Sequence, residues 1–308
     1  MDKNWTYEGQ EDKAFHKGIS LLAGGCTVSE FGTRRRRDYH TQALVLKGLG
    51  RAREEGQRLN LPGKISGTSN VHLAKRFGLL PIGTVAHEWF MGVAAIENDY
   101  ENATEKALQY WMGCFGEGVL AIALTDTFGT PAFLRAFAKP VAPLTNSSSS
   151  ASTRDASTDK VPSYGQVFTG VRQDSGDPAT FVKMMRKFYD DQGITDKKTI
   201  VFSDSLDINL CLHYKSLCDE AGMIPSFGVG TFLTNDFVDT ITGKKSVPLN
   251  IVIKISSANG RPAVKISDNI GKNTGDKQKI AEVKRALGYE EKEWAGGDET
   301  TRWGTGET

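Results

Sequence analysis

The stretch PIGTVAHEW, residues 81–89, joins an apolar strand-like run to a helical pattern, and we interpret the rest of the chain as arranged around it. His87 lies where the run turns into the helix. Backbone N–H groups at a helix start point outward and attract anions, so a histidine there is well placed to meet a phosphate. For this residue taken alone, a histidine that only packs and caps the helix is the alternative.

Composition bounds the class of protein. The 308 residues, 39% hydrophobic and 24% charged, can bury a sizeable core, and they fit one large domain as well as two. A formal net charge of +1 gives no general attraction to nucleic acid or to an anionic membrane. No apolar run approaches the length of a membrane span or a signal-peptide core. The four cysteines lack metal-ligand spacing, so we expect an intracellular globular protein with reduced thiols.

Short β-like runs alternate with helical patterns along most of the chain. One helix is expected to begin with Asp177 as its cap and Pro178 in its first turn, and to end at Gly193. Strand alternating with helix predicts an α/β fold with a parallel sheet and right-handed crossovers, and about eight strands indicate a TIM-like barrel. The expected strands are residues 26–32, 64–68, 81–85, 119–125, 166–172, 199–203, 223–229 and 250–255.

Two stretches fall outside this scheme. Residues 143–160 are rich in serine, threonine and charge, which predicts a disordered surface insertion without chemistry of its own. The glycine-rich and acidic tail, residues 294–308, is expected to fray, with Trp294 and Trp303 as candidate anchors.

Polar side chains follow the expected strands and should converge on one mouth of the barrel. Four successive arginines, residues 34–37, come after the first strand. Successive residues cannot all point the same way, so at least two of them are expected to be solvated. A guanidinium fork at a strand end can bind carboxylate or phosphate, and one or two of the four are expected to do so.

Later strand ends carry acids, another arginine and glycines. Asp126 can accept a hydrogen bond from one nitrogen of His87 and leave the other as a nucleophile, although a turn-capping aspartate is the alternative. Arg172 and Asp174 share one face of an extended chain, so they could hold a cationic ring and an anion together. Residues 228–231, Gly-Val-Gly-Thr, let backbone amides and a hydroxyl surround a phosphate.

The chain resembles the nicotinate phosphoribosyltransferase family, in its fungal or broadly eukaryotic and proteobacterial form. The segments that carry the resemblance occur in the family's order, from Trp5 to about Trp303. An ordered set is far more specific than any one motif. The segments are SEFGTRRRRDY, GTSNVHLAKRFGLLPIGTVAHEW, IALTDTFGT, VRQDSGDP, FSDSL, FGVGTFLTNDF and KISDNIGKNTGD.

The resemblance implies the irregular TIM-like α/β barrel of type II phosphoribosyltransferases. It places the catalytic barrel at residues 25–257, with the insertion 143–160 inside it. Residues 1–24, a helical remnant, and the C-terminal segment 258–308 would then belong to a second α/β domain.

The resemblance also implies a reaction, in NAD biosynthesis by Preiss-Handler salvage. The ring nitrogen of nicotinate attacks the anomeric carbon of 5-phosphoribosyl 1-pyrophosphate, giving nicotinate mononucleotide and pyrophosphate, with ATP hydrolysis coupled through a phosphohistidine. Elementary chemistry agrees with this reaction. A pyridine nitrogen has a free lone pair and needs no general base, so catalysis reduces to positioning and charge stabilisation.

Site residues are carried over from the resemblance onto matching positions. His87 matches the phosphorylated histidine, Asp126 the carboxylate that partners it, and Asp174 a residue at the ribose or the developing positive charge. Thr84 and Arg172 would contact nicotinate or its surroundings, and residues 228–231 the 5-phosphate. The expected substrate-binding set is Arg35, Gly83, Thr84, Arg172, Asp204, Gly228, Gly230 and Thr231, and no metal site made by the protein alone is expected.

Cofactors and partners follow from the same resemblance. ATP and Mg²⁺ are expected, with the ion carried by phosphoribosyl pyrophosphate and ATP and held largely by phosphate oxygens and water. The partners expected are the small-molecule substrates and a second copy of the chain in a homodimer with a shared active site, with no nucleic acid and no membrane. The expected compartment is the cytoplasm, with the nucleus as an addition.

One departure from the family concerns the N-terminus. The chain starts at Met1-Asp2-Lys3-Asn4-Trp5, where the family is already under way. Either the sequence is a fragment or a truncated gene model, or the protein lacks the family's N-terminal portion, which by the resemblance supplies half of a small α/β domain and an aromatic residue that stacks on the pyridine ring in the other subunit's site. In the second case the protein should expose apolar surface and have little activity.

Three interpretations stay open. The first is a nicotinate phosphoribosyltransferase coupled to ATP. The second is the sister activity, nicotinamide phosphoribosyltransferase, although the cluster at residues 33–36 and the form GTVAHEW favour nicotinate. The third is an inactive truncated subunit that interacts with or regulates a full-length partner.

Overall fold

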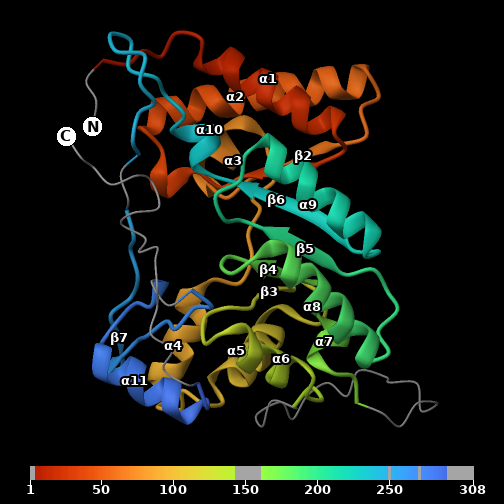
Figure 1. Cartoon of the computed structure of the whole chain (residues 1–308), viewed down its shortest axis with the longest axis vertical. Coiled ribbons are helices and arrows are strands. Elements are labelled where there is room, and N and C mark those ends of the chain that lie inside the picture. The colour runs from red at the N-terminus through yellow and green to blue at the C-terminus, as the bar shows by residue number, and fades with distance from the viewer. Residues whose placement is uncertain (1–3, 143–160, 249–250, 270–271, 290–308) are drawn as a thin grey trace.

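A parallel sheet flanked by helices organises the chain (Figure 1). The computed structural model describes residues 4–142, 161–248, 251–269 and 272–289. Within them, the sheet has six strands in the order β2-β1-β6-β5-β4-β3. All neighbouring strands in it are parallel, so their carboxyl ends lie at one edge. The strands are β1 (Thr27–Glu30), β2 (Lys64–Thr68), β3 (Ile122–Leu124), β4 (Gly170–Gln173), β5 (Thr199–Phe202) and β6 (Ile224–Val229).

Helices fill the connections between the strands, and local capping sets several of their starts. Asp177 accepts from the N–H of Thr180 at the start of α8, as the sequence predicts, and Asp38, Asp207 and Asp276 make the same kind of cap. The helices are α1 (Gln10–Ala23), α2 (Tyr39–Arg58), α3 (Val71–Phe77), α4 (His87–Glu97), α5 (Ala103–Phe115), α6 (Thr130–Phe137), α7 (Tyr164–Val167), α8 (Pro178–Asp191), α9 (Ile208–Glu220), α10 (Thr231–Thr234) and α11 (Lys277–Ala286), with the 3₁₀ turn η1 (Thr33–Arg35). A hairpin, β7 (Ser257–Ala258) and β8 (Arg261–Pro262), turns at Asn259 and Gly260, both with positive φ.

The parallel α/β class is confirmed, but an eight-stranded barrel is not. Residues 81–85 and the described part of 250–255 form no strand. Instead, the segment 80–85 passes from one edge of the sheet to the other. Its Leu80 carbonyl and Ile82 N–H bond to Thr68 at the end of β2, and its Val85 N–H bonds to the Ile122 carbonyl of β3. Because it crosses between the edges, it cannot pair along either one as a strand.

This crossing segment curls the sheet around a small interior space. A cavity of about 190 Å³ lies there, and its lining comes from β1, β2, β3, β5, β6 and the crossing segment. Three of the lining side chains are small hydroxyls, Ser29, Ser66 and Ser226. The strands are therefore arranged around an inside, although the described backbone does not close as a strand-to-strand ring.

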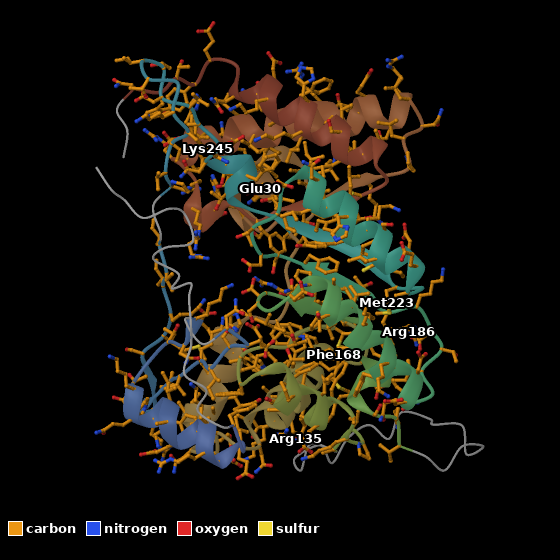
Figure 2. The ribbon with its side chains drawn as sticks, in the orientation of Figure 1. Glu30, Arg135, Phe168, Arg186, Met223 and Lys245 are labelled. Atoms are coloured by element: carbon orange, nitrogen blue, oxygen red, sulfur yellow. The ribbon has the colours of Figure 1, made fainter. Side chains whose placement is uncertain are left out.

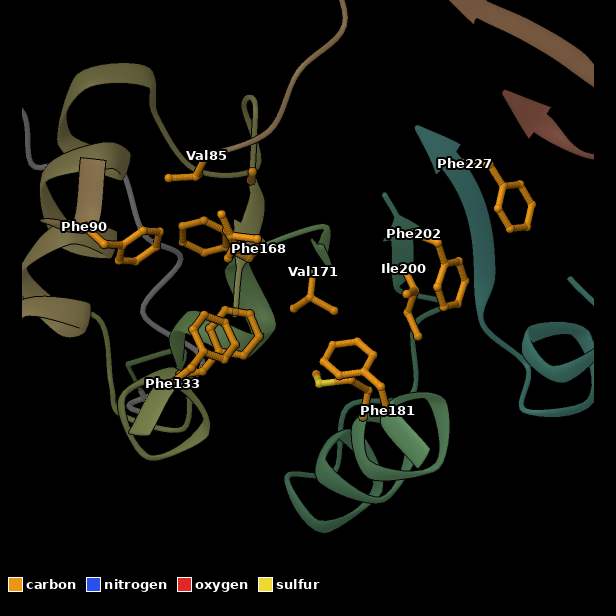
Figure 3. Packing of buried hydrophobic residues seen from close by; sticks show 14 of the residues in the cluster. Val85, Phe90, Phe133, Phe168, Val171, Phe181, Ile200, Phe202 and Phe227 are labelled. Atoms are coloured by element: carbon orange, nitrogen blue, oxygen red, sulfur yellow. The ribbon is translucent and has the colours of Figure 1, made fainter. Parts of the chain in front are cut away.

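Aromatic side chains on the helix-facing side of the strands form the core (Figure 3). Phe202 of β5 and Phe227 of β6 stack with their ring centroids 5.6 Å apart. Phe168, between α7 and β4, packs edge-on against Phe137 of α6. These rings are fully buried, so they supply a large part of the apolar area that holds helices to the sheet.

Helices α1 and α2 lie side by side along the top of the molecule in Figure 1. Small residues allow their close approach. A Cβ atom at Gly18 would come within 2.6 Å of the Cβ of Ala52, and one at Gly48 within 2.9 Å of the Cβ of Ala14. The contacts advance together along both helices, so the two run in the same direction.

Some predictions about organisation stay open. The insertion at 143–160 and the tail with Trp294 and Trp303 lie outside the described residues. The division at residues 24 and 257 also stays a prediction, although α1 packs directly on α2. Among the described residues, no helix is both long and apolar enough to cross a membrane.

Replacing Gly48 with alanine should destabilise the protein by about 2 kcal/mol, because the new Cβ would clash with the Glu11 carbonyl oxygen and with Ala14. Gly50, on the same helix, has open space around the position of a Cβ. Gly50→Ala should therefore stabilise α2 by roughly 0.5–1 kcal/mol through helix propensity. Urea denaturation of the two variants measures the difference. Equal free energies of unfolding would show that the α1–α2 contact is not tight.

Candidate active site

A large pocket lies at the carboxyl ends of the strands. Its volume is about 900 Å³, and residues from the ends of β1, β4, β5 and β6 line it together with the start of α4. Every site residue predicted from the sequence except Asp126 lies in its wall. Those lining residues are Arg35, Gly83, Thr84, His87, Arg172, Asp174, Asp204, Gly228, Gly230 and Thr231.

His87 is the first residue of α4, as predicted, and is only 4% exposed. Its Nδ1 lies 3.0 Å from the hydroxyl of Thr127, and its Nε2 lies 3.1 Å from Oδ2 of Asp174. A carboxylate can only accept, so in this arrangement Nε2 carries a proton and Nδ1 accepts from Thr127. Asp174 lines the pocket and Thr127 does not, so Nε2 is the nitrogen on the pocket side.

The expectation that Asp126 hydrogen-bonds His87 is wrong. Its Oδ1 lies 3.8 Å from Nε2, too far for a hydrogen bond. Its other oxygen, Oδ2, accepts from the hydroxyls of Ser175 and Ser267 and lies 3.5 Å from Nζ of Lys265. Asp126 is completely buried, and its Oδ1 has no hydrogen-bond partner among the described residues. Asp126 and His87 lie near each other at the strand ends, as predicted. The hydrogen-bond partner of His87 is nevertheless Asp174, which follows β4.

Arg172 is fixed by three acceptors on three segments. Its Nε donates to Ser203 Oγ at 2.7 Å, Nη1 to Thr84 Oγ1 at 3.2 Å, and Nη2 to Asp174 Oδ1 at 3.0 Å. The predicted pairing of Arg172 with Asp174 on one face of the chain is therefore present. The guanidinium also lies 5.9 Å from the centre of the Phe31 ring, which lines the same pocket.

Two of the four arginines line the pocket, but the other two are not solvated as expected, because Arg37 is buried and Arg36 is half-buried. Arg34 and Arg35 line the pocket. Arg36 donates to Oε1 of Gln42 at 2.8 Å, and Arg37 packs over the ring of Trp5. The change of direction coincides with the end of the η1 turn, because Arg34 and Arg35 lie in it and Arg36 is its extended C-cap.

Glycines bring backbone close to the pocket on two sides. A Cβ at Gly228 would meet the Phe31 ring at 2.4 Å, so any side chain there would displace that ring. Gly83 has open space within 4 Å, and a side chain there would project into the pocket instead.

Sequence reasoning missed several pocket residues. Lys265, only 5% exposed, and Lys272 both line the pocket. Lys272 donates to Asp204 Oδ2 at 3.0 Å and to the Asp174 carbonyl. Both lysines occur in KISDNIGKNTGD, a segment that carries the family resemblance but whose lysines have no predicted role. Phe31 was missed because an aromatic residue after a strand is an ordinary core residue.

The buried charges balance without a proton on His87. Asp126 and Asp174 are matched by Lys265 and Arg172. Burial disfavours the ionised form of Asp174, but Arg172 and His87 outweigh it and hold the pKa of this carboxyl well below its ordinary value. Burial lowers the pKa of His87, Lys265 adds to the effect, and the two carboxylates oppose it. At neutral pH the imidazole is therefore uncharged, as a nucleophile must be.

The pKa of His87 should lie below the ordinary value of 6.5. Asp174→Asn should lower it further by removing a carboxylate that favours the imidazolium ion, whereas Lys265→Met should raise it by removing a cation. Titration of the ring protons by NMR measures the three values, with His87→Gln assigning the resonance. A wild-type pKa above 6.5 would contradict burial as the dominant effect.

Comparison with known proteins identifies the family of the chain. A sequence model described as the nicotinate phosphoribosyltransferase family matches residues 26–291. The nicotinate phosphoribosyltransferase of Saccharomyces cerevisiae is 42% identical over 98% of this chain and 66% of its own length. A crystal structure from the same yeast superimposes with a TM-score of 0.82 at 42% identity, covering 94% of this chain and 65% of that one.

A more distant structure has the same fold. The nicotinate phosphoribosyltransferase of Porphyromonas gingivalis matches with a TM-score of 0.74 at 32% identity, over 92% of this chain and 65% of that one. The chain thus spans about two thirds of the length of these relatives. From the family match and these identities, the chain belongs to the nicotinate phosphoribosyltransferase family.

Proposed function

We propose that this chain carries the active site of a nicotinate phosphoribosyltransferase, which forms nicotinate mononucleotide and pyrophosphate from nicotinate and 5-phosphoribosyl 1-pyrophosphate. One observation carries the proposal. A guanidinium held by Thr84, Asp174 and Ser203 lies beside an aromatic ring in a large pocket that is lined by strand-end glycines, arginines and acids. In the reaction, the ring nitrogen forms a bond to the anomeric carbon while the bond to pyrophosphate breaks, and no proton has to move.

Nicotinate recognition needs a flat apolar contact and a cation. Phe31 supplies an aromatic face, and Arg172 supplies the charge, because an arginine has five N–H groups and contacts with the described residues account for three of them. A carboxylate held by those remaining groups would leave the pyridine ring against Phe31. Phe31 would thus supply, from within this chain, an aromatic contact that the family resemblance attributes to the other subunit.

The charge that develops during the reaction is positive, on the ribose carbon and the pyridine ring. Asp174 lies at the pocket wall, and its carboxyl is kept ionised by Arg172 and His87. A fixed carboxylate stabilises such a charge without reorganising. The leaving pyrophosphate and the 5-phosphate need positive groups, which Arg34, Arg35 and the backbone of residues 228–231 would supply in the same pocket.

His87 is proposed to accept a phosphoryl group from ATP at Nε2. The Thr127 hydroxyl can accept as well as donate, so the ring proton can move to Nδ1 and free the Nε2 lone pair. The N–P bond then forms as the bond between the γ-phosphorus and ADP breaks. Burial supports this role because it keeps the ring neutral.

Mg²⁺ would be held largely by substrate phosphates. Within the described residues, no three or more His, Cys, Asp or Glu side chains are grouped as metal ligands. The donors that fit are the pocket carboxylates Asp174 and Asp204, which could complete a coordination sphere made of phosphate oxygens and water. The ion would supply neutralisation of the leaving pyrophosphate.

Assembly and compartment remain proposals. A homodimer with a shared site would cover apolar side chains next to the pocket, since Val247 is 61% exposed and Ile253 69% exposed. The cytoplasmic location stays a prediction from the sequence.

Incubation of the purified protein with phosphoribosyl pyrophosphate, ATP, Mg²⁺ and either nicotinate or nicotinamide tests the function. We expect mononucleotide from nicotinate only, measured by chromatography. Arg172→Gln should raise the KM for nicotinate roughly 10- to 100-fold, the scale of a hydrogen bond between charged groups. Arg51→Gln, an exposed arginine paired with Glu11 and Asp12, is the control and should leave KM unchanged. A folded protein without product, or equal use of nicotinamide, would refute the proposal.

His87→Ala should abolish ATP hydrolysis and its acceleration of product formation while leaving a slower, ATP-independent reaction. ADP release and acid-labile protein phosphate are the two readouts. His213→Ala, on the exposed face of α9, should leave both unchanged. Persistence of acid-labile phosphate in His87→Ala would place the acceptor elsewhere.

A further inference from the structure

We infer that Glu30 is a positioning residue that fixes the two pocket loops at residues 32–35 and 68–70 relative to each other. The inference rests on the proposed function, because it concerns the anion-binding wall of the same pocket. Glu30 ends β1 and has no exposed surface. It lies inside the upper half of the molecule (Figure 2) and does not line the pocket itself.

The Glu30 carboxylate joins three segments. Its Oε1 accepts from the backbone N–H of Gly32, in the loop after β1. Its Oε2 accepts from the hydroxyl of Thr68, at the end of β2, and from Nε2 of Gln42 on α2 at 2.8 Å. One side chain therefore ties together two strand ends and a helix.

These contacts lie one or two residues from the pocket wall. Arg34 and Arg35 follow Gly32, and Ser69 follows Thr68; all three line the pocket. The backbone N–H of Ser69 donates to the Glu30 carbonyl at 2.9 Å, which adds a main-chain bond to the side-chain ones.

Thr33 extends the network across the two loops. Its hydroxyl oxygen accepts from Nε2 of Gln42 at 2.9 Å and from Nδ2 of Asn70 at 3.2 Å. Thr33, the residue before Arg34, is thus held by two donors, and one of them, Gln42, is itself held by Glu30.

Charge alone cannot explain an acid at this place. A carboxylate beneath a wall that binds anions repels the ligand, and its burial is costly. Burial raises the pKa of Glu30, while Thr68, Gln42 and Gly32 oppose that rise by hydrogen bonding. What the carboxylate supplies is acceptance of three hydrogen bonds in a fixed geometry.

Glutamine cannot replace it. An amide at position 30 would offer one oxygen and one NH₂ group, so the NH₂ would face a donor. Gln42 cannot turn its own amide to compensate, because its Oε1 accepts from Arg36 Nη1 at 2.8 Å. Glutamine at position 30 would therefore cost either the Gln42–Arg36 hydrogen bond or one of the hydrogen bonds that hold the two loops.

Four single variants and the Glu30→Gln/Thr68→Val double variant separate positioning from charge. Glu30→Gln removes the charge, Thr68→Val removes one donor but keeps the charge, and Thr68→Ser keeps the hydroxyl. Glu55→Gln, an exposed acid of α2 paired with Arg58, is the control. If Glu30 positions the loops, Glu30→Gln and Thr68→Val weaken binding, Thr68→Ser restores it, and the double variant is no worse than about the larger single effect. Simple repulsion predicts tighter binding by Glu30→Gln and no change in Thr68→Val.

Two measurements are made on each variant. Calorimetry with nicotinate mononucleotide should give a Kd about tenfold higher for Glu30→Gln and for Thr68→Val, the scale of a hydrogen bond to a charged group. Hydrogen exchange of the ligand-free protein should be about tenfold faster at residues 32–35 and 68–70, with α8 unchanged.

The outcomes decide separate statements. Unchanged exchange in both loops, or tighter binding by Glu30→Gln, overturns the positioning role. A wild-type protein that does not bind the mononucleotide refutes the proposed function instead, and the exchange comparison then decides the role of Glu30 by itself.

Discussion

Backbone hydrogen bonds from the segment 80–85 to both edges of the parallel sheet hold the site together. Leu80 and Ile82 bond to Thr68 on one edge, and Val85 bonds to Ile122 on the other. Parallel pairing already puts six carboxyl ends at one level, and the crossing segment adds Gly83, Thr84 and His87 to that level. The pocket takes residues from segments far apart in the chain, and this one segment links both edges of the sheet that carries them.

The electrostatics of the site follow from pairing inside that frame. Two carboxylates near His87 are matched by one lysine and one arginine, so burial can keep the imidazole neutral. The same arginine is braced by Ser203 and Thr84, which leaves it oriented before any ligand arrives. The buried acid Glu30 lies outside the pocket. Its hydrogen bonds hold the loops that carry Arg34 and Arg35, as those of Asp174 hold Arg172.

Much of the fold could be predicted because its signals are local. Asp177 and Pro178 start α8 as expected. Strand β2 matches its predicted range, 64–68, and the other five strands of the sheet overlap theirs. The run at 81–85 is predicted as a strand because its composition, PIGTV, is typical of one. It is not one, since whether a segment pairs along its length depends on where both sheet edges lie, and that information is not local.

By itself the sequence determined the parallel α/β class, the family, and the level at which most site residues lie, because periodicity, caps and strand ends are read from neighbours in the chain. Only the tertiary structure decided the partners. Asp174, and not Asp126, meets His87; Lys265 and Phe31 enter the pocket; and Glu30 joins two loops. Each of these contacts links residues far apart in sequence, and its distance depends on how the sheet curls, which no spacing along the chain encodes.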